Sequence, residues 1–305
     1  MKVLVTGGAG FIGSHTVDAL VKNGYEVAVV DNLSNGRKEN INKDAKFYEI
    51  DVESEKLKRV FESERPDMAI HLAAQISLRK SVENPMFDAR QNILGSINLL
   101  QCCKEFEVDK IVYASSVAVY GEPKYLPVDE KHATKPASPY GLSKLAAEEY
   151  IKLYHRMRGL DYVILRYANV YGPRQMSDGE AGVVAIFTDR MLHNKPPVVF
   201  GDGEQTRDFV YVEDVALANL LALKNGKNKV FNIGSGKETS VNDVFGKIRN
   251  ILGINIRSIR AEPKQEIRRI YISNEKAVKE LGWNPKTNID DGLKKTVAWF
   301  KERQF

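Results

Sequence analysis

The sequence has few cysteines and no long hydrophobic run. Its 305 residues include only two cysteines, the neighbours Cys102 and Cys103. Adjacent cysteines rarely form a disulfide, and this spacing matches no metal site. No stretch reaches the roughly 18 apolar residues that a membrane span needs. The N-terminus leads directly into a strand-like segment, which leaves no room for a signal peptide. We therefore expect a cytoplasmic protein with no metal site and no membrane contact.

Charge of one sign is not concentrated anywhere in the chain. The formal net charge is +5, and the basic residues are spread along the sequence, which argues against a nucleic-acid-binding surface. A mild positive field would still favour an anionic ligand such as a nucleotide. With 43% hydrophobic residues, the chain can form a substantial core, as one large domain or as two lobes.

Three glycines at a spacing of three residues follow the first predicted strand, residues 2–6. They are Gly7, Gly10 and Gly13, and an amphipathic segment follows them to residue 22. In a strand, turn and helix of this kind, the first glycine permits the tight turn and the second lets a phosphate approach the backbone. The third lets the helix pack on the strand. The segment therefore predicts a site for the pyrophosphate of a dinucleotide.

An acidic residue ends the second predicted strand. This strand, residues 26–30, leads to Asp31, which lies eighteen residues after Gly13. A carboxylate here can accept hydrogen bonds from both ribose hydroxyls of the adenosine half, and it would repel a 2′-phosphate. NAD is therefore the expected cofactor. Arg37 lies close enough in sequence to weaken the discrimination against NADP, unless its side chain is simply solvated.

A tyrosine and a lysine are spaced to share one face of a predicted helix. Tyr140 and Lys144 are four residues apart. A free tyrosine, with a pKa of about 10, is a poor base near neutrality, and a nearby ammonium group lowers that pKa. Ser116 follows an apolar predicted strand, so its hydroxyl is expected at the same edge. Together the three predict a proton-transfer site for an alcohol or carbonyl. Alone, the tyrosine and lysine would also fit a partly exposed helix pair.

Strands and helices alternate through about residue 170. The predicted strands are residues 2–6, 26–30, 46–50, 68–72, 110–115 and 162–166, and the predicted helices are residues 12–22, 54–63, 88–105 and 139–158. This alternation predicts an α/β fold, a Rossmann-type doubly wound parallel sheet with helices on both faces. We expect residues 1–170 to form this domain and residues 171–305 to form mainly a smaller substrate-binding lobe. The chain is expected to return to the sheet near residues 205–235, and residues 230–234 resemble a buried strand.

Ligands of an open parallel sheet lie beyond the carboxyl ends of its strands. Asp51 and Val52 follow the third predicted strand and are expected to meet the adenine. Residues 72–74 follow the fourth, where small side chains leave room for a diphosphate and a ribose. His71 is expected to be packed at the strand end rather than catalytic. Asn92, in the next helix, either satisfies local partners or reaches the cofactor.

Together these motifs closely resemble the extended short-chain dehydrogenase/reductase family, and within it the epimerases of UDP-glucose and UDP-galactose. The resemblance covers nearly the whole chain. It rests on motifs at residues 6–13, 31–33, 51–52, 71–75, 115–121, 140–144, 165–173 and 201–210. The resemblance implies an NAD cofactor, a UDP-sugar substrate and a homodimer. The implied reaction oxidises C4 of a UDP-hexose to a 4-keto sugar, with hydride passing to NAD and returning on the other face.

The resemblance also implies a role for each site residue. Ser116 would hydrogen-bond the reacting sugar oxygen, Tyr140 would act as the base, and Lys144 would bridge the nicotinamide ribose and tune the tyrosine. The implied substrate-binding residues are Ser116, Tyr140, Asn169, Arg207, Lys264 and Glu266. The implied cofactor-binding residues are Gly7, Gly10, Phe11, Ile12, Gly13, Asp31, Asn32, Asp51, Val52, Leu72, Ala73, Ala74, Asn92, Lys144 and Tyr167.

The chain departs from the family pattern at two places. Ile76 stands where family members often carry a lysine. Many members also have a Pro-x-Arg-x-Gly-Glu/Asp segment near the C-terminus, and here residues 262–267 differ from it. In this segment Lys264 is expected to replace the arginine, and Glu266 is expected to accept hydrogen bonds from a ribose.

Related enzymes that eliminate water or carbon dioxide use an acid close to the reacting sugar. In several of them one or two acids follow the catalytic serine or threonine, whereas here Val117 and Ala118 follow Ser116. Epimerisation is therefore the expected outcome, unless Glu122 or Asp129 supplies the acid. The alternatives are an epimerase of UDP-N-acetylhexosamine or UDP-glucuronate, a nucleotide-sugar dehydratase or decarboxylase, and a non-catalytic NAD-binding protein.

Two predicted helices, 88–105 and 139–158, carry apolar residues on more faces than one sheet can cover. We expect them to pack against the same helices of a second copy in a homodimer. The residues that motivate this expectation are Leu94, Ile97, Leu100, Leu145, Tyr150, Leu153 and Tyr154.

Overall fold

The computed structural model describes residues 1–177, 182–264 and 266–303. Its centre is a parallel sheet of seven strands in the order β3-β2-β1-β4-β5-β6-β10. The strands are β1 (Lys2–Thr6), β2 (Glu26–Asp31), β3 (Lys46–Glu49), β4 (Met68–His71), β5 (Lys110–Ser116), β6 (Asp161–Tyr167) and β10 (Lys229–Ile233). The predicted Rossmann-type α/β fold is confirmed, and β10 returns to the sheet beside β6.

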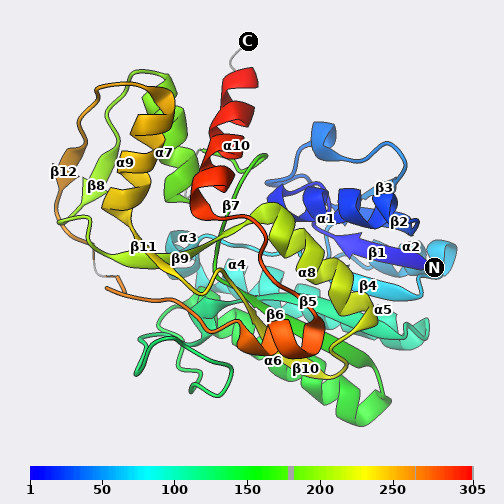
Figure 1. Cartoon of the computed structure of the whole chain (residues 1–305). Coiled ribbons are helices and arrows are strands. Elements are labelled where there is room, and N and C mark those ends of the chain that lie inside the picture. The colour runs from blue at the N-terminus through cyan, green and yellow to red at the C-terminus, as the bar shows by residue number, and fades with distance from the viewer. Residues whose placement is uncertain (178–181, 265, 304–305) are drawn as a thin grey trace.

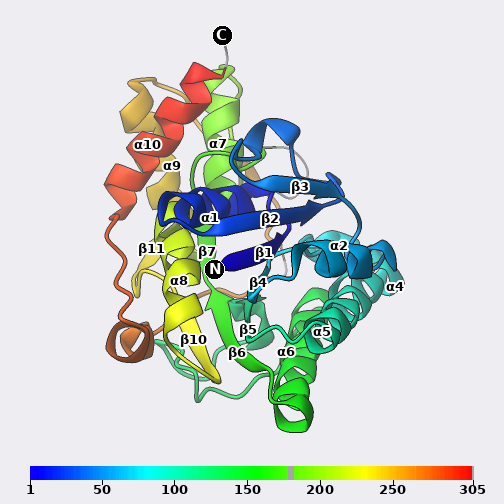
Figure 2. The same cartoon turned by 90° about the vertical axis from the view of Figure 1, so that its right-hand side faces the viewer.

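Helices cover both faces of this sheet (Figure 2). One face carries α1 (Phe11–Lys22) and α8 (Val212–Lys224), which pack against each other. The other face carries α2 (Lys56–Glu64), α5 (Gly95–Glu105) and α6 (Pro139–Arg158). The apolar strands are therefore buried on both sides, and each face has its own core, the first around Phe231 and Trp283 and the second around Phe61 and Tyr113.

The helix that the sequence predicted over residues 88–105 is divided in the structure. Two short helices, α3 (Leu78–Glu83) and α4 (Pro85–Ala89), precede a π-helical turn at Arg90–Leu94, and α5 follows it. The side chains of Ser77 and Asn84 cap α3 and α4 by accepting hydrogen bonds from backbone N–H groups. The predicted start of this helix was wrong, because these two caps begin new helices that the apolar pattern does not reveal.

The remaining chain forms a smaller lobe that follows the carboxyl end of β6 (Figure 1). One sheet contains β7 (Asn169–Tyr171), β9 (Thr206–Tyr211) and β11 (Glu238–Ser240), and a second contains β8 (Val198–Phe200) and β12 (Ile259–Ala261). The helices α7 (Val183–Leu192), α9 (Val241–Leu252) and α10 (Ile289–Glu302) pack around a third core. Short 3₁₀ helices lie at Lys38–Asn40 and Val117–Val119, and a π-helical turn lies at Ala277–Leu281.

The two cysteines are free and lie on the buried side of α5. Burial raises the pKa of Cys102 to about 11, so this thiol stays protonated at neutral pH. Within the described ranges, no helix is long and apolar enough to cross a bilayer. In the same residues, no three His, Cys, Asp or Glu side chains are arranged to hold a metal ion.

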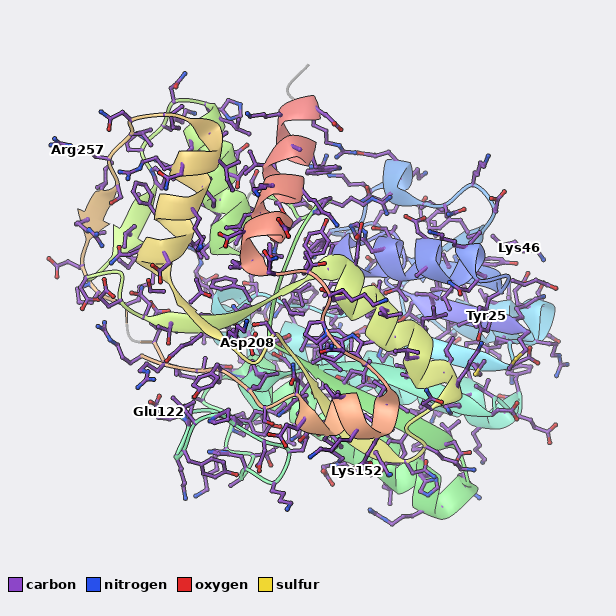
Figure 3. The ribbon with its side chains drawn as sticks, in the orientation of Figure 1. Tyr25, Lys46, Glu122, Lys152, Asp208 and Arg257 are labelled. Carbon is purple, nitrogen blue, oxygen red and sulfur yellow. The ribbon has the colours of Figure 1, made fainter. Side chains whose placement is uncertain are left out.

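A buried carboxylate ties the amino ends of the first strands together. Glu64, at the end of α2, is 3% exposed. It accepts hydrogen bonds from Lys2 Nζ at 2.9 Å, Lys46 Nζ at 3.0 Å and Tyr48 Oη at 2.5 Å. Burial alone raises the pKa of Glu64, but the hydrogen bonds from Tyr48, Lys2 and Lys46 outweigh it and lower the pKa to about 2. Lys46 itself lies at the outer edge of the molecule (Figure 3).

We predict that Glu64→Gln lowers the free energy of unfolding by about 1 to 2 kcal/mol at pH 7, a value reduced for the solvent screening of Lys46. A carboxyl with a depressed folded pKa contributes stability above its unfolded pKa and loses it as pH falls through the folded value. The difference between variant and wild type, measured by denaturant titration, is therefore expected to shrink between pH 5 and pH 2. A difference that stays constant over this range would contradict the role given to Glu64.

Candidate active site

The predicted glycine turn joins β1 to α1. Gly7 has a φ of +73°, and a Cβ there would lie 2.6 Å from the nitrogen of Ala73. A Cβ at Gly13 would overlap the carbonyl oxygen of Gly7. Both positions therefore require glycine. The turn brings β1, the start of α1 and the segment after β4 into direct contact.

The first turn of α1 is open to an anion. Gly10 is the N-cap and has no side chain to accept from the first N–H groups, which belong to Phe11, Ile12 and their neighbours. No acidic residue lies in this turn. Free N–H groups and the helix dipole attract negative charge at such an end. The turn and helix therefore fit the pyrophosphate of a dinucleotide, as the glycine spacing predicted.

Asp31 shapes the loop beside this turn. Its Oδ2 accepts from the Ala9 nitrogen at 3.0 Å, and its Oδ1 accepts from the Leu33 nitrogen at 2.8 Å. Burial raises the pKa of Asp31, and these two hydrogen bonds oppose the rise. Each carboxylate oxygen retains a further lone pair for a ribose hydroxyl. Arg37 lies 3.5 Å from the carboxylate of Glu39, so it is paired with its own neighbour.

The residues expected on the adenine side lie together at the ends of β2 and β3. Asn32 Nδ2 donates to Asp51 Oδ2 at 2.7 Å, and Val52 is buried in the core next to them. Leu72, Ala73 and Ala74 follow β4 and are half-buried. The structure thus gathers these expected residues along the carboxyl ends of neighbouring strands.

His71 is packed in the interior. Its Nδ1 lies 2.7 Å from Thr6 Oγ1, and its Nε2 lies 3.0 Å from Ser96 Oγ. Ser96 Oγ donates to the Asn92 carbonyl at 2.6 Å, so the histidine donates from Nε2 and accepts at Nδ1. Burial, reinforced by Lys144, lowers the pKa of His71 to about 3. The residue is therefore neutral near pH 7, which agrees with the expected packing role.

Ser116, Tyr140 and Lys144 meet where β5 ends against α6. Ser138 caps α6 by accepting from the Gly141 nitrogen at 3.1 Å. The Ser116 hydroxyl lowers the pKa of Tyr140, which places these two side chains beside each other. Lys144 is 4% exposed, and its Nζ donates to the Ala114 carbonyl at 2.9 Å. A hydroxyl, a phenol and an ammonium group are thus held together at one edge of the sheet.

The protonation of this group differs from the prediction. Burial raises the pKa of Tyr140 to about 12, the hydrogen bond from Ser116 lowers it, and the charge of Asp88 raises it. Burial lowers the pKa of Lys144 to about 8, while Asp88 and Glu148 raise it. The expectation that Lys144 lowers the pKa of Tyr140 does not hold for the protein alone, because its ammonium group is directed at the Ala114 carbonyl and is itself poorly solvated.

A buried polar network that the sequence did not predict lies beside the pair. Asn92 Oδ1 accepts from the Gln75 nitrogen at 2.8 Å. Asn92 Nδ2 donates to the Gln75 carbonyl, Asp88 Oδ1 and Ser143 Oγ at 2.9, 3.1 and 3.0 Å. Asn92 thus has local partners for its amide, and its contact with the cofactor stays a prediction. Nothing in the sequence distinguishes these residues from the polar face of a helix.

A second buried cluster anchors α6 to the sheet. Glu148 accepts from Arg166 Nε at 2.9 Å and Nη2 at 2.6 Å, and from Ser115 Oγ at 2.6 Å. These three residues belong to α6, β6 and β5, and Ser115 directly precedes Ser116. The arginine inside an otherwise apolar predicted strand was a usable signal, because a buried guanidinium needs a carboxylate partner.

Tyr167 and Asn169 differ in their exposure. Tyr167 is buried, and its hydroxyl donates to Asn219 Oδ1 at 2.7 Å, on the side of α8. Contact of Tyr167 with a nicotinamide remains a prediction, and it would involve the ring or the backbone rather than the hydroxyl. Asn169 is exposed at the start of β7, where a ligand can reach it.

Arg207, Lys264 and Glu266 come together in the second part of the site. Arg207 Nη2 donates to Glu266 Oε2 at 2.5 Å, and Lys264 Nζ lies 3.8 Å from the ring centre of Phe200. Glu266, in the segment that departs from the family pattern, therefore contacts the strand that carries Arg207. The cavity there has a volume of about 280 Å³ and is lined by Phe200, Gly201, Asp202, Gln205, Pro263, Lys264, Glu266 and Arg268.

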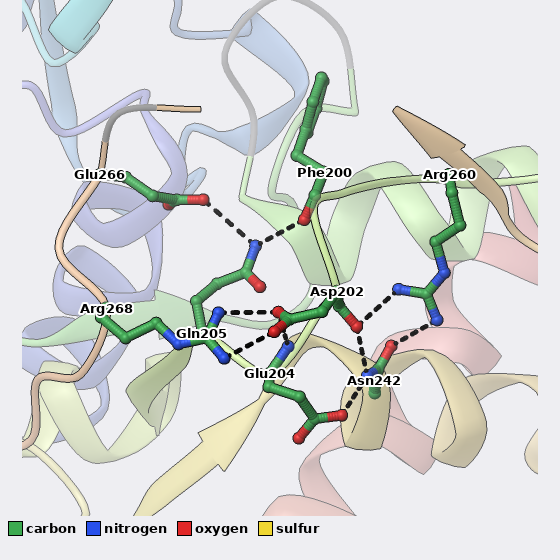
Figure 4. A network of polar contacts seen from close by, with 8 residues as sticks. All are labelled: Phe200, Asp202, Glu204, Gln205, Asn242, Arg260, Glu266 and Arg268. Atoms are coloured by element: carbon green, nitrogen blue, oxygen red, sulfur yellow. Dashed lines mark hydrogen bonds and ion pairs between the residues drawn. The ribbon is translucent and has the colours of Figure 1, made fainter. Parts of the chain in front are cut away.

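Asp202 organises the wall of this cavity (Figure 4). Its carboxylate accepts from both Nη atoms of Arg268 at 2.7 Å, and its carbonyl accepts from Arg260 at 2.8 Å and Asn242 at 2.9 Å. Gln205 Nε2 donates to Glu266 Oε1 at 3.2 Å. The cavity wall is thus built by ion pairs and hydrogen bonds between separate segments of the lobe.

The buried Asp208 (Figure 3) fixes β9, the strand that presents Arg207. It accepts from the Ser235 nitrogen and Ser235 Oγ, both at 2.7 Å, and from the Gly236 nitrogen at 3.1 Å. Burial raises the pKa of Asp208, and these hydrogen bonds oppose the rise. The loop after β10 is thereby tied to β9, the strand that carries Arg207.

Comparison with known proteins gives one family. The model of the NAD dependent epimerase/dehydratase family matches residues 3–234. A Methanocaldococcus jannaschii protein with the provisional name UDP-glucose 4-epimerase is 54% identical over 301 residues, 98% of each chain. The Thermotoga maritima UDP-glucose 4-epimerase, solved with UDP-glucose, has a TM-score of 0.98 and 48% identity over 100% of both chains. The Thermus thermophilus UDP-glucose 4-epimerase, solved with NAD, has a TM-score of 0.95 and 42% identity over 99% of both.

We predict that Gly13→Ala lowers the thermal stability of the protein strongly, because its Cβ would overlap the Gly7 carbonyl. Core overpacking of this kind typically costs about 1 to 3 kcal/mol. Gly246→Ala is the matched control. It lies in α9, and a methyl group added there would have no neighbour within 4 Å, so it is expected to raise stability slightly. Equal melting temperatures for the two variants would contradict the tight turn.

Proposed function

Because the chain belongs to the NAD-dependent epimerase/dehydratase family, we propose that it is an NAD-dependent UDP-sugar 4-epimerase that interconverts UDP-glucose and UDP-galactose. The observation that carries the proposal is the meeting of Ser116, Tyr140 and Lys144 at the end of β5. This group lies on the same sheet edge as the glycine turn at Gly7. A non-catalytic dinucleotide-binding protein would need the turn but not all three proton-handling side chains.

In this proposal, some site residues transfer the proton and others bind the cofactor and the substrate. Ser116 holds the C4 oxygen of the sugar, and Tyr140 removes the proton from that hydroxyl and later returns it. NAD supplies the hydride acceptor and donor when it is bound. Lys144, whose ammonium group donates to the Ala114 carbonyl, would hold the ribose of the bound cofactor. Arg207 leaves Glu266 to grip the diphosphate, because a guanidinium group matches phosphate oxygens in geometry and charge.

The surroundings of Ser116 support epimerisation over elimination. Val117–Val119 form a 3₁₀ turn directly after it and offer no acid. Asp129 accepts from Tyr125 Oη at 2.7 Å, and this hydrogen bond lowers the pKa of Asp129, so it is a carboxylate near neutrality. Glu122 is exposed, and its charge raises the pKa of Arg207. The charge of Asp88 raises the pKa of Tyr140, but Asp88 is buried and accepts hydrogen bonds from the amides of Gln75 and Asn92.

Tyr140→Phe is expected to reduce the conversion of UDP-galactose to UDP-glucose by about two to four orders of magnitude, because only the proton-transferring hydroxyl is lost. Binding of NAD, measured by fluorescence titration, is expected to stay near the wild-type value. Phe87→Ala changes an exposed aromatic residue and serves as the control for a general loss of activity. Wild-type turnover in Tyr140→Phe would refute the role of Tyr140. A parallel panel with UDP-N-acetylglucosamine and UDP-glucuronate tests the choice of sugar, which depends on the C2 and C6 substituents.

We also propose that the protein is a homodimer that pairs through α5 and α6. Leu94 and Met157 on this face are 55% and 59% exposed, and Tyr150 and Leu153 are also exposed. A hollow of about 610 Å³ between the two helices is lined by Gln101, Lys104, Glu105, Leu153, Tyr154, Met157 and Arg158. A second copy would bury these apolar side chains. The expectation for Leu100 was wrong, since it is buried in the core of its own chain.

We predict that wild-type protein has the mass of a dimer in light scattering at micromolar concentration. Leu153→Glu is expected to give a monomer, because it introduces a charge at the centre of the proposed contact. Ile259→Glu, at an exposed apolar residue of β12 away from this face, is the matched control and should remain a dimer. A monomeric wild-type mass, or a dimer in Leu153→Glu, would contradict the proposed interface.

A further inference from the structure

The charges of two buried carboxylates, Asp88 and Glu148, raise the pKa of Lys144. The two carboxylates have different hydrogen-bond partners. Glu148 is paired with Arg166 at 2.6 Å, so a cation already balances its charge. Asp88, on α4, is 1% exposed. Its Oδ1 accepts from Gln75 Nε2 at 2.8 Å and Asn92 Nδ2 at 3.1 Å. In the part of the chain that the structure describes, Asp88 thus has neutral amide donors and no salt bridge.

The same network connects Asp88 to the helix turn that carries the reacting pair. Asn92 Nδ2 also donates to Ser143 Oγ at 3.0 Å. Ser143 Oγ in turn donates to the carbonyl of Tyr140 at 3.0 Å. Asp88 therefore cannot move independently of α6. The desolvation of a buried carboxylate is unfavourable unless hydrogen bonds and a nearby positive charge compensate it.

We propose that Asp88 is a positioning residue of the reaction: its carboxylate, held by Gln75 and Asn92 and linked through Ser143 to the helix turn of Tyr140, supplies a fixed charge beside Tyr140 and Lys144. The inference rests on the proposed function, since it concerns the same pair of side chains. Asp88 acts on the reacting groups through its charge and does not touch the sugar.

The charge of Asp88 shifts the pKa of Tyr140 and the pKa of Lys144 in the same direction. Burial raises the pKa of Tyr140 and lowers that of Lys144, and the charge of Asp88 raises both. The other titratable groups around Lys144 are Glu148 on α6, the neutral His71 on β4 and Tyr113, whose ring centre lies 5.1 Å from Nζ. Removing the Asp88 charge therefore lowers the pKa of both Tyr140 and Lys144. The pH profile is expected to move to lower pH whichever of the two groups loses its proton first.

The test is the pH dependence of kcat and kcat/KM for UDP-galactose conversion in the NAD-loaded enzyme. Asp88→Asn keeps an oxygen for the donors Gln75 and Asn92 and removes only the charge. The whole pH profile is expected to move to lower pH by about one unit. Asp88→Glu retains the charge and is expected to keep the wild-type profile at a reduced kcat. Asp44→Asn changes the net charge equally at an exposed position and is the control without a shift.

Folding of each variant is checked by thermal melting, and Asp88→Ser replaces Asp88→Asn if the latter does not fold. A profile of the charge-free variant that coincides with wild type overturns the inference. An equal shift in Asp88→Glu also overturns it, since packing would then be the cause. A wild-type enzyme that converts no UDP-sugar refutes the proposed function instead, so the two failures are distinct.

Discussion

The contact between the end of β5 and the first turns of α6 is the constraint on which the rest of the site depends. Lys144 is hydrogen-bonded to the Ala114 carbonyl, and the Ser116 hydroxyl lies beside Tyr140 and lowers its pKa. One helix turn after Lys144, the buried pair of Glu148 and Arg166 joins α6 to β6. Removing one partner of such a pair leaves an uncompensated buried charge. The geometry of proton transfer is therefore maintained by groups that never meet a ligand.

Two sheets contribute to one site because the chain passes repeatedly between the large sheet and the small lobe. β7 follows β6 into the small lobe, and β9 leads into α8 on the way back to β10. The turn at Gly7 thus belongs to the large sheet, whereas Arg207 belongs to the small one. A ligand with a diphosphate in the lobe and a sugar at Tyr140 would span both. In the structure, the Arg207 guanidinium is held by its ion pair with Glu266.

Local signals in the sequence predicted the parts of the fold that depend on local chemistry. The glycine spacing, the buried strands and the Tyr140–Lys144 pair all have fixed periods or steric requirements, and the structure contains each of them. The short helices before Arg90 and the network around Asp88 were missed, because they depend on caps and on contacts between distant segments. The pKa of Tyr140 was also misjudged, since burial depends on the whole fold and not on the spacing of two residues.

The central claim is that the protein, with bound NAD, oxidises and then reduces the same carbon of a UDP-sugar. The most direct measurement uses UDP-galactose that carries deuterium at C4, incubated with the NAD-loaded enzyme and analysed by mass spectrometry and NMR. The account predicts UDP-glucose of unchanged mass with the deuterium still at C4, because the hydrogen that leaves C4 returns to it. Loss of the label to solvent, or a product lighter by water or carbon dioxide, would contradict it.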